Sequence, residues 1–174
     1  MRSSETEPRE AAAARHHRVL VIGYGNPLRG DDGLGRVIAE RVAETARPDA
    51  IDVIVAHQLT PELAEPISRA RLVIFVDAAT DVPAGRVKVA PMVVTADDAA
   101  APGCFAHHCG PGQLLAAARR LYGREPEAWS LVVGGQRWDY AVGLSPAVER
   151  GVPRLLRYIE MLIAARLTAE PSHA

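Results

Sequence analysis

The sequence predicts an α/β fold in which helices cover both faces of a mostly parallel, twisted β-sheet. Short apolar runs rich in β-branched residues recur along the chain, and such runs are typical of strands that are buried on both faces. Segments with helical periodicity alternate with these runs. Strands that alternate with helices form βαβ units, whose strands are parallel. The 174 residues suffice for one domain with its own core.

The first strand and the first helix are separated by a long loop. Residues 19–22 form a continuous apolar run, Val-Leu-Val-Ile, which ends at Gly23. From Asp31 onward the apolar positions recur at helical spacing, with charged residues between them. These apolar positions are Leu34, Val37, Ile38 and Val42. The pattern predicts a buried strand followed by an amphipathic helix.

Two further strands are predicted before the middle of the chain. Residues 49–56 are the second strand candidate, and residues 72–77 are an apolar third strand that ends in a carboxylate, Asp77. Between them, Thr60 suits an N-cap and Pro61 suits the first turn of a helix. This completes the order β-α-β-α-β.

The second half of the chain continues the alternation after an irregular stretch. Residues 86–94 alternate loosely, as in an edge strand or a hairpin arm, whereas residues 95–112 are rich in glycine and proline. Residues 114–122 are helical, and residues 129–133 form a strand. Ser145-Pro146 then begins a long final helix.

Composition and charge exclude several classes of protein. Lys plus Arg total 20 and Asp plus Glu total 21, a net charge of −1, which argues against a dedicated nucleic-acid or polybasic membrane binder. The apolar runs are too short to span a bilayer, and no signal-peptide pattern precedes them. We therefore expect a cytoplasmic protein, with residues 1–17 as a flexible N-terminal tail and residues 18–174 as a single α/β domain.

The predicted topology indicates where a ligand would bind. In parallel sheets, ligands bind beyond the carboxyl ends of the strands. In this chain those ends correspond to residues 23–32, 56–60 and 77–80. Candidate functional residues are therefore sought in these three segments and in the irregular stretch that precedes the second half.

The first of these loops does not fit a dinucleotide site. Gly23 and Gly25 match the beginning of a G-x-G-x-x-G motif, but Leu28 stands where the third glycine belongs. Asp31 and Asp32 follow at the predicted helix start, where two carboxylates would repel a phosphate. One of them is explained as an N-cap, but a second adjacent carboxylate is not. The loop is better suited to a cation.

Other polar residues fall at the same edge of the predicted sheet. Asp77 ends a buried strand, and histidines occur at His57 and at the adjacent pair His107-His108. Each alone has an ordinary structural explanation, as a turn residue or as a capping or packing residue. Together, Asp32, Asp77 and one histidine form a donor set suited to a first-row divalent metal. Cys104 and Cys109 leave a thiol nucleophile as an alternative.

The loop at residues 23–35 resembles the signature of the nickel–iron hydrogenase maturation endopeptidases, a G-x-G-N loop followed by D-[DE]-G-x-G. Further segments resemble the same family and extend the similarity over nearly the whole chain after the tail. They are residues 72–78, residues 107–115, Gly134 and the turn at residues 143–146. The resemblance implies a three-layer α/β/α sandwich. It also implies removal of a short C-terminal extension from the hydrogenase large-subunit precursor after nickel insertion.

The resemblance also implies the site residues. Carried over by motif, the acid/acid/His triad that contacts nickel is Asp32, Asp77 and His107, and it serves both as the catalytic and as the metal-binding set. The nickel is recognised in the substrate precursor, although another divalent metal could occupy the site in the isolated protein. We expect a monomer. Many family members have glutamate where this chain has Asp32, and residues 57–62 replace a glycine-rich turn.

Three other functions are compatible with some of these features. A metal-binding accessory module, such as a nickel chaperone or scaffold, would use the same residues without peptidase activity. A nucleotide-binding domain would use Gly23 and Gly25. A cysteine hydrolase would use Cys104 or Cys109.

Overall fold

The computed structural model describes residues 19–100 and 109–168. The expected tail at residues 1–17 and the candidate ligand His107 lie outside the described residues. Within the described ranges, the chain forms a five-stranded sheet in the order β2-β1-β3-β5-β4. Its strands are β1 (Val19–Tyr24), β2 (Ile51–Ala56), β3 (Leu72–Ala84), β4 (Val87–Met92) and β5 (Glu127–Gly134). All neighbours pair in parallel except β4 and β5, which are antiparallel.

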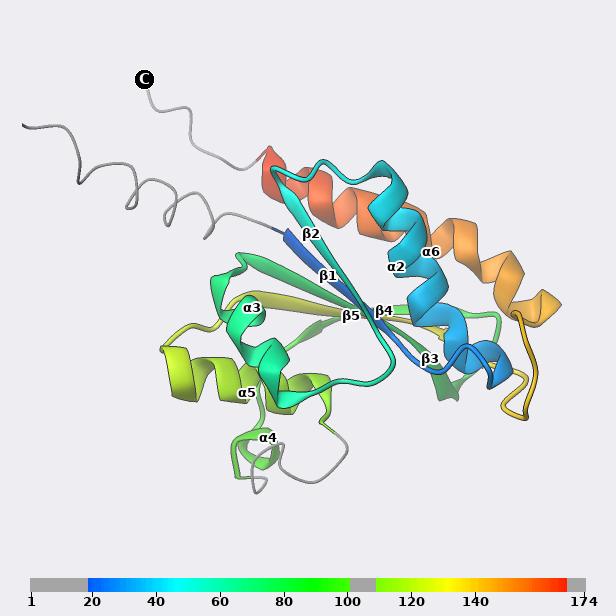
Figure 1. The fold of residues 1–174 in the computed structure, drawn as a ribbon, viewed down its shortest axis with the longest axis horizontal. Coiled ribbons are helices and arrows are strands. Elements are labelled where there is room, and N and C mark those ends of the chain that lie inside the picture. Colours follow the sequence, from blue (N-terminus) through cyan, green and yellow to red (C-terminus); the bar gives the residue numbers. More distant parts are fainter. Residues whose placement is uncertain (1–18, 101–108, 169–174) are drawn as a thin grey trace, which may run out of the picture.

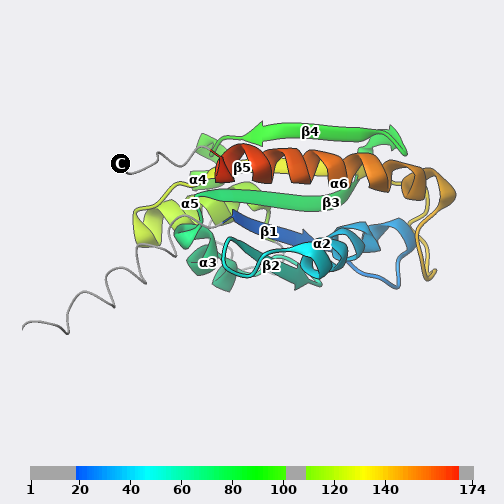
Figure 2. The ribbon, with the colours of Figure 1, turned by 90° about the horizontal axis from the view of Figure 1, so that it is seen from above.

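Helices cover both faces of this sheet (Figures 1 and 2). The α-helices of the described ranges are α2 (Leu34–Thr45), α3 (Ala64–Arg69), α4 (Ala96–Ala100), α5 (Pro111–Tyr122) and α6 (Pro146–Leu167). Two short 3-10 turns, η1 (Gly30–Gly33) and η2 (Pro61–Leu63), precede α2 and α3. Helices α2 and α6 lie on one face, while α3 and α5 lie on the other. None of these helices has both the length and the apolar character needed to cross a bilayer.

The alternation of side chains along the central strands creates two separate cores. In β1, Val19 and Val21 pack with α2 and α6, whereas Leu20 and Ile22 pack with α3 and α5. Side chains of a strand point alternately to opposite faces, so a continuous apolar run fills both layers. The predicted α/β/α architecture around a mostly parallel sheet is confirmed.

Several element boundaries differ from the sequence prediction. Strand β3 does not end at Asp77 but continues to Ala84, because β5 pairs with it past Asp77, with an irregularity between Ala79 and Ala84. The irregular stretch contains the short helix α4. Thr60 is the N-cap residue of η2 and Pro61 lies in its first turn, as predicted, although the Thr60 side chain makes no capping hydrogen bond.

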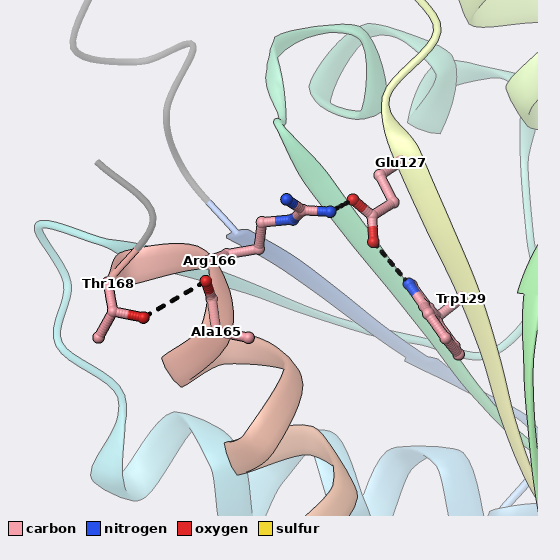
Figure 3. A network of polar contacts seen from close by, with 5 residues as sticks. All are labelled: Glu127, Trp129, Ala165, Arg166 and Thr168. Carbon is pink, nitrogen blue, oxygen red and sulfur yellow. Dashed lines mark hydrogen bonds and ion pairs between the residues drawn. The ribbon is translucent and has the colours of Figure 1, made fainter. Parts of the chain in front are cut away.

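The last helix is fixed at both of its ends. The Ser145 hydroxyl accepts a hydrogen bond from the backbone N–H of Val148 at 3.4 Å, as an N-cap residue does. At the other end, Arg166 forms an ion pair with Glu127 of β5, and the Trp129 indole donates to the same carboxylate at 2.8 Å (Figure 3). The N-terminal end of α6, which lies near the candidate site, is therefore part of a well-anchored element.

Candidate functional site

The candidate site lies where the direction of the chain across the sheet reverses. From β1 the chain crosses to β2 on one side and then returns to β3 on the other side of β1. The loops that leave β1 and β3 therefore diverge, and a crevice opens between them at the carboxyl end of the sheet. Gly23 of β1 pairs with Val76 of β3, so the following residues, Tyr24 and Asp77, stand next to each other at this point.

A cleft of about 310 Å³ occupies the reversal point. Its described lining comes from the last residue of β1 and the segment after it, the loop after β2, the end of the apolar part of β3, and a cysteine two residues before α5. These residues are Tyr24, Gly25, Asn26, Arg29, Asp32, His57, Gln58, Leu59, Asp77 and Cys109. The structure thus brings together two of the three predicted ligands, Asp32 and Asp77, which are 45 positions apart in the sequence (77 − 32).

The glycines of the first loop serve close packing rather than phosphate binding. A Cβ atom on Gly35 would lie 2.3 Å from the carbonyl oxygen of Tyr24 and 2.4 Å from that of Val76, so the first turn of α2 rests directly on β1 and β3. Gly25 has a φ of +133°, and a Cβ atom there would lie 1.8 Å from the carbonyl oxygen of Asp32. The backbone of Asp32 is therefore held against the loop after β1.

Asp31 has a structural role. Its carboxylate is fully buried and accepts hydrogen bonds from the backbone N–H groups of Gln136 (2.7 Å), Arg137 (2.8 Å) and Ser145 (2.6 Å) and from the Ser145 hydroxyl (2.8 Å). Neither η1 nor α2 has a side-chain cap, so the interpretation of one aspartate as an N-cap is wrong. The carboxylate instead bonds to residues more than a hundred positions away.

These hydrogen bonds determine the ionisation of Asp31. Burial by itself would raise the pKa of the carboxyl group, but the donors from Ser145, Gln136 and Arg137 stabilise the charged form and leave the pKa below its ordinary value. Asp31 is therefore an ionised carboxylate at neutral pH, and because it is fully buried among these donors it is not open to a ligand in the cleft.

Asp32 has the opposite surroundings. It is partly exposed in the cleft, and one of its carboxylate oxygens accepts the backbone N–H of Asn26 at 2.9 Å. The Asn26 side chain in turn accepts the backbone N–H of Leu28 at 2.9 Å, which fixes the turn that carries the donor. Among the residues that the structure describes, one hydrogen bond holds the Asp32 carboxylate, which retains oxygen lone pairs that face the cleft.

Asp77 faces the same cleft from β3. Burial raises its pKa to about 7, and the negative charge of Asp32 adds to that rise. The backbone N–H of Ala78 donates to Asp77 at 2.7 Å and the Tyr24 hydroxyl also donates to it, and both bonds partly offset the increase. Burial, and then the charge and the hydrogen bond of Asp77, also raise the pKa of Tyr24, which therefore stays a donor. Two carboxyl groups that repel each other in one cleft are a donor set that a cation would stabilise.

The interaction between these groups predicts opposite effects of two substitutions on the pKa of Asp77. Asp32→Asn removes a nearby negative charge and should lower the Asp77 pKa below about 7, whereas Tyr24→Phe removes a bond to the charged form and should raise it. The measurement is an NMR titration of the Asp77 carboxyl carbon in the metal-free protein. Shifts in the same direction for both variants would contradict this account. Asp49→Asn is the control, because Asp49 is exposed and precedes β2 at the amino ends of the parallel strands, away from the cleft.

The remaining predicted residues divide into two groups. His57 and Cys109 line the cleft, whereas Cys104, His107 and His108 lie outside the described residues. Within residues 19–100 and 109–168, no three side chains of His, Cys, Asp or Glu are grouped so that they could hold a metal ion. Asp32 and Asp77 thus line the same cleft, and the assignment of Asp32, Asp77 and His107 as metal ligands stays a prediction.

Sequence reasoning missed Tyr24 and Asn26. Tyr24 is the last residue of β1 and Asp77 follows the apolar part of β3, and the parallel register of these neighbouring strands would have placed the two residues side by side. Asn26 acts through its backbone N–H, which donates to Asp32, and through a local turn, so its residue type gave little indication of this role.

Comparison with known structures places this fold among hydrogenase maturation proteases. The hydrogenase 2 maturation peptidase from Thaumarchaeota archaeon SCGC_AB-539-E09 superposes with a TM-score of 0.64 at 25% identity, covering 84% of this chain and 98% of the other. The endopeptidase HybD from E. coli gives a TM-score of 0.66 at 24% identity, with 87% and 94% covered. The [NiFe] hydrogenase maturation protease HybD from Thermococcus kodakarensis gives 0.65 at 23%, with 84% and 99% covered.

The fold and the position of the cleft define the class. The chain is an α/β protein with a site at the topological reversal of a mostly parallel sheet. Within that class it resembles the nickel–iron hydrogenase maturation endopeptidases, and the resemblance predicted from the first loop is confirmed by these structural neighbours. No protein-family model and no curated protein matches the sequence significantly.

Proposed function

We propose that this protein is an endopeptidase that removes a short C-terminal extension from the large-subunit precursor of a nickel–iron hydrogenase after nickel insertion. The observation that carries the proposal is the meeting of Asp32 and Asp77 in one cleft, at the reversal point of a fold shared with maturation proteases. The structural neighbours support the reaction class, and the two carboxylates support the recognition of a cation.

The electrostatics of the cleft favour a substrate that carries a divalent cation. Asp32 and Asp77 repel each other when both are ionised, and part of the rise in the Asp77 pKa reflects that repulsion. A cation placed between them would remove this penalty. In the proposal, Asp32, Asp77 and His107 contact the nickel that the precursor already holds, so a precursor without nickel lacks the charge that draws it into the cleft.

The residues around the two carboxylates hold them in place for this task. The Asn26 N–H fixes one oxygen of Asp32, while the Tyr24 hydroxyl and the Ala78 N–H bind Asp77. With nickel in the cleft both carboxyl groups would stay ionised at neutral pH, and a carboxylate oxygen beside the scissile bond can accept a proton from the attacking water. Contact with the nickel would then place the scissile peptide bond beside Asp77. A water molecule attacks the carbonyl carbon of that bond, the C–N bond breaks, and the proton taken from the water passes to the leaving amine.

The test is intact-mass analysis of a hydrogenase large-subunit precursor incubated with this protein. Loss of a short C-terminal peptide is expected from the nickel-loaded precursor and not from the nickel-free precursor. Cleavage of both forms would contradict nickel recognition. No cleavage of a matched, folded, nickel-loaded precursor would contradict the endopeptidase and would favour a metal-binding accessory module, which a nickel titration of this protein would then examine.

A further inference from the structure

The buried carboxylate of Asp31 joins three parts of the chain directly behind the cleft. It connects η1 with the segment after β5, through Gln136 and Arg137, and with the residue that caps α6, Ser145. The backbone adds to this connection, because the N–H of Asp31 donates to the carbonyl of Arg137 at 2.9 Å. We call this group of four residues, Asp31, Gln136, Arg137 and Ser145, the Asp31 hub.

The hub determines the direction in which the neighbouring carboxylate points. Asp31 and Asp32 are consecutive residues of η1, and consecutive side chains of a 3-10 helix are about 120° apart because it has 3.0 residues per turn. With the Asp31 side chain fixed inward, the Asp32 side chain turns away from the hub, and it lines the cleft. On the cleft side, only the Asn26 N–H bond holds the Asp32 carboxylate among the hydrogen bonds of the described residues.

The chemistry of the hub requires a carboxylate. Three backbone N–H groups and one hydroxyl converge on its two oxygens, all as donors. An asparagine has the same shape, but its NH₂ group would face donors, so at least one contact would become repulsive. An apolar residue would leave several buried donors without partners. A merely space-filling role would not need this charge.

We propose that Asp31 is a positioning residue, which acts through the hub to hold the Asp32 carboxylate toward the cleft. The inference rests on the proposed function in one respect, namely that Asp32 is the group whose position governs cleavage. Loss of a residue that orients a metal-binding side chain typically lowers metal affinity or activity by about 10–100-fold.

The experiment compares Asp31→Asn and Ser145→Ala with a control that is destabilised elsewhere. Val152→Ala serves as that control, because Val152 is a buried residue in the second turn of α6 whose apolar side chain cannot hydrogen-bond to Asp31. Ser145→Thr keeps the hydroxyl and tests for rescue. Cleavage of the nickel-loaded precursor is measured at a temperature at which circular dichroism shows every variant to be folded.

We expect Asp31→Asn to lower kcat by about 10-fold or more relative to Val152→Ala, with a KM within about twofold. Ser145→Ala loses the hydroxyl bond to Asp31 and the N-cap bond from Val148 but keeps the backbone bond to Asp31, so it should have a smaller effect, and Ser145→Thr should restore activity. Losses in kcat for Asp31→Asn and Ser145→Ala no greater than that of Val152→Ala would overturn the proposal. If Asp31→Asn does not fold, the comparison of Ser145→Ala with Ser145→Thr decides in the same way.

A second readout does not depend on cleavage. The Asn26 N–H donates to Asp32, so its hydrogen exchange reports whether that carboxylate stays in place. Faster exchange at Asn26 in Asp31→Asn or Ser145→Ala, with no change in Val152→Ala, supports the positioning role. Unchanged exchange in the folded variants would refute it. A wild-type protein that cleaves nothing would refute the proposed function alone, and the exchange data would still decide on Asp31.

Discussion

Asp32→Asn is expected to lower the rate of precursor cleavage on the order of 100-fold or more while leaving the fold intact, an effect of the size seen when a group that stabilises charge in an active site is removed. The amide oxygen of asparagine can still accept the Asn26 N–H that now holds the carboxylate at 2.9 Å. The substitution therefore keeps the local structure and removes the negative charge that faces the cleft.

Intact-mass kinetics with the nickel-loaded precursor measure the rate, and urea unfolding measures the stability. Asp49→Asn is the matched control, since Asp49 is exposed and lies at the amino ends of the parallel strands, whereas the cleft lies at their carboxyl ends. Its rate should equal that of the wild-type protein. Wild-type cleavage by Asp32→Asn would show that this carboxylate does not act in the reaction, and the proposed triad would lose its first member.

Gly35→Ala is expected to reduce the free energy of unfolding by more than about 3 kcal/mol, beyond the cost of most single substitutions. The added Cβ would lie 2.3 Å from one carbonyl oxygen and 2.4 Å from another, both on the strands beneath α2. These are backbone atoms of a buried sheet, so the helix must move as a whole to relieve the contact. The displacement would also pull on η1, which carries Asp32.

Gly123→Ala provides the comparison for the loss at Gly35. Gly123 ends α5 with a φ of +67°, and no atom lies within 4 Å of an added Cβ. Its substitution should cost only the conformational penalty of a left-handed residue, about 1–2 kcal/mol. Urea denaturation of both variants tests the difference. Equal losses would mean that α2 can shift on the sheet without penalty, contrary to the packing described above.

Most of the sheet could be predicted from the sequence because its central strands are apolar on both faces. The runs at residues 19–22 and 72–76 are short and rich in β-branched residues, as strands covered by helices on both faces are, so they could be predicted as strands. The extension of β3 to Ala84 could not be predicted, because it is stabilised by pairing with β5, which lies more than forty residues further along the chain. Pairing over such a distance leaves no local pattern.

The candidate site was predictable in part for the same reason. The position of Asp77 at the end of an apolar strand, together with the rule for parallel sheets, placed it near the loop that carries Asp32. The sequence could not predict that Asp31 would be buried in a structural role while Asp32 lines the cleft. Both are aspartates at a helix start, and only the three-dimensional contacts of Asp31 with Gln136, Arg137 and Ser145 distinguish them.

The carboxylate pair in the cleft makes the thermal stability of the metal-free protein depend on pH. The Asp77 pKa is raised from its ordinary value near 4 to about 7 in the folded chain, so the folded state holds a proton that the unfolded chain releases between these values. The contribution of Asp77 to folding is therefore most favourable below about pH 4 and declines up to about pH 7, after which it stays constant. The lowered pKa of Asp31 has the opposite effect: its ionised carboxylate stabilises the folded state, and this stabilisation is lost only as the pH falls into stronger acid. Because the two groups act in opposite directions, the free energy of unfolding of the metal-free protein should be highest in mildly acidic solution. At neutral pH, where ionisation of Asp77 lowers this free energy, binding of a positively charged ligand in the cleft should raise it again.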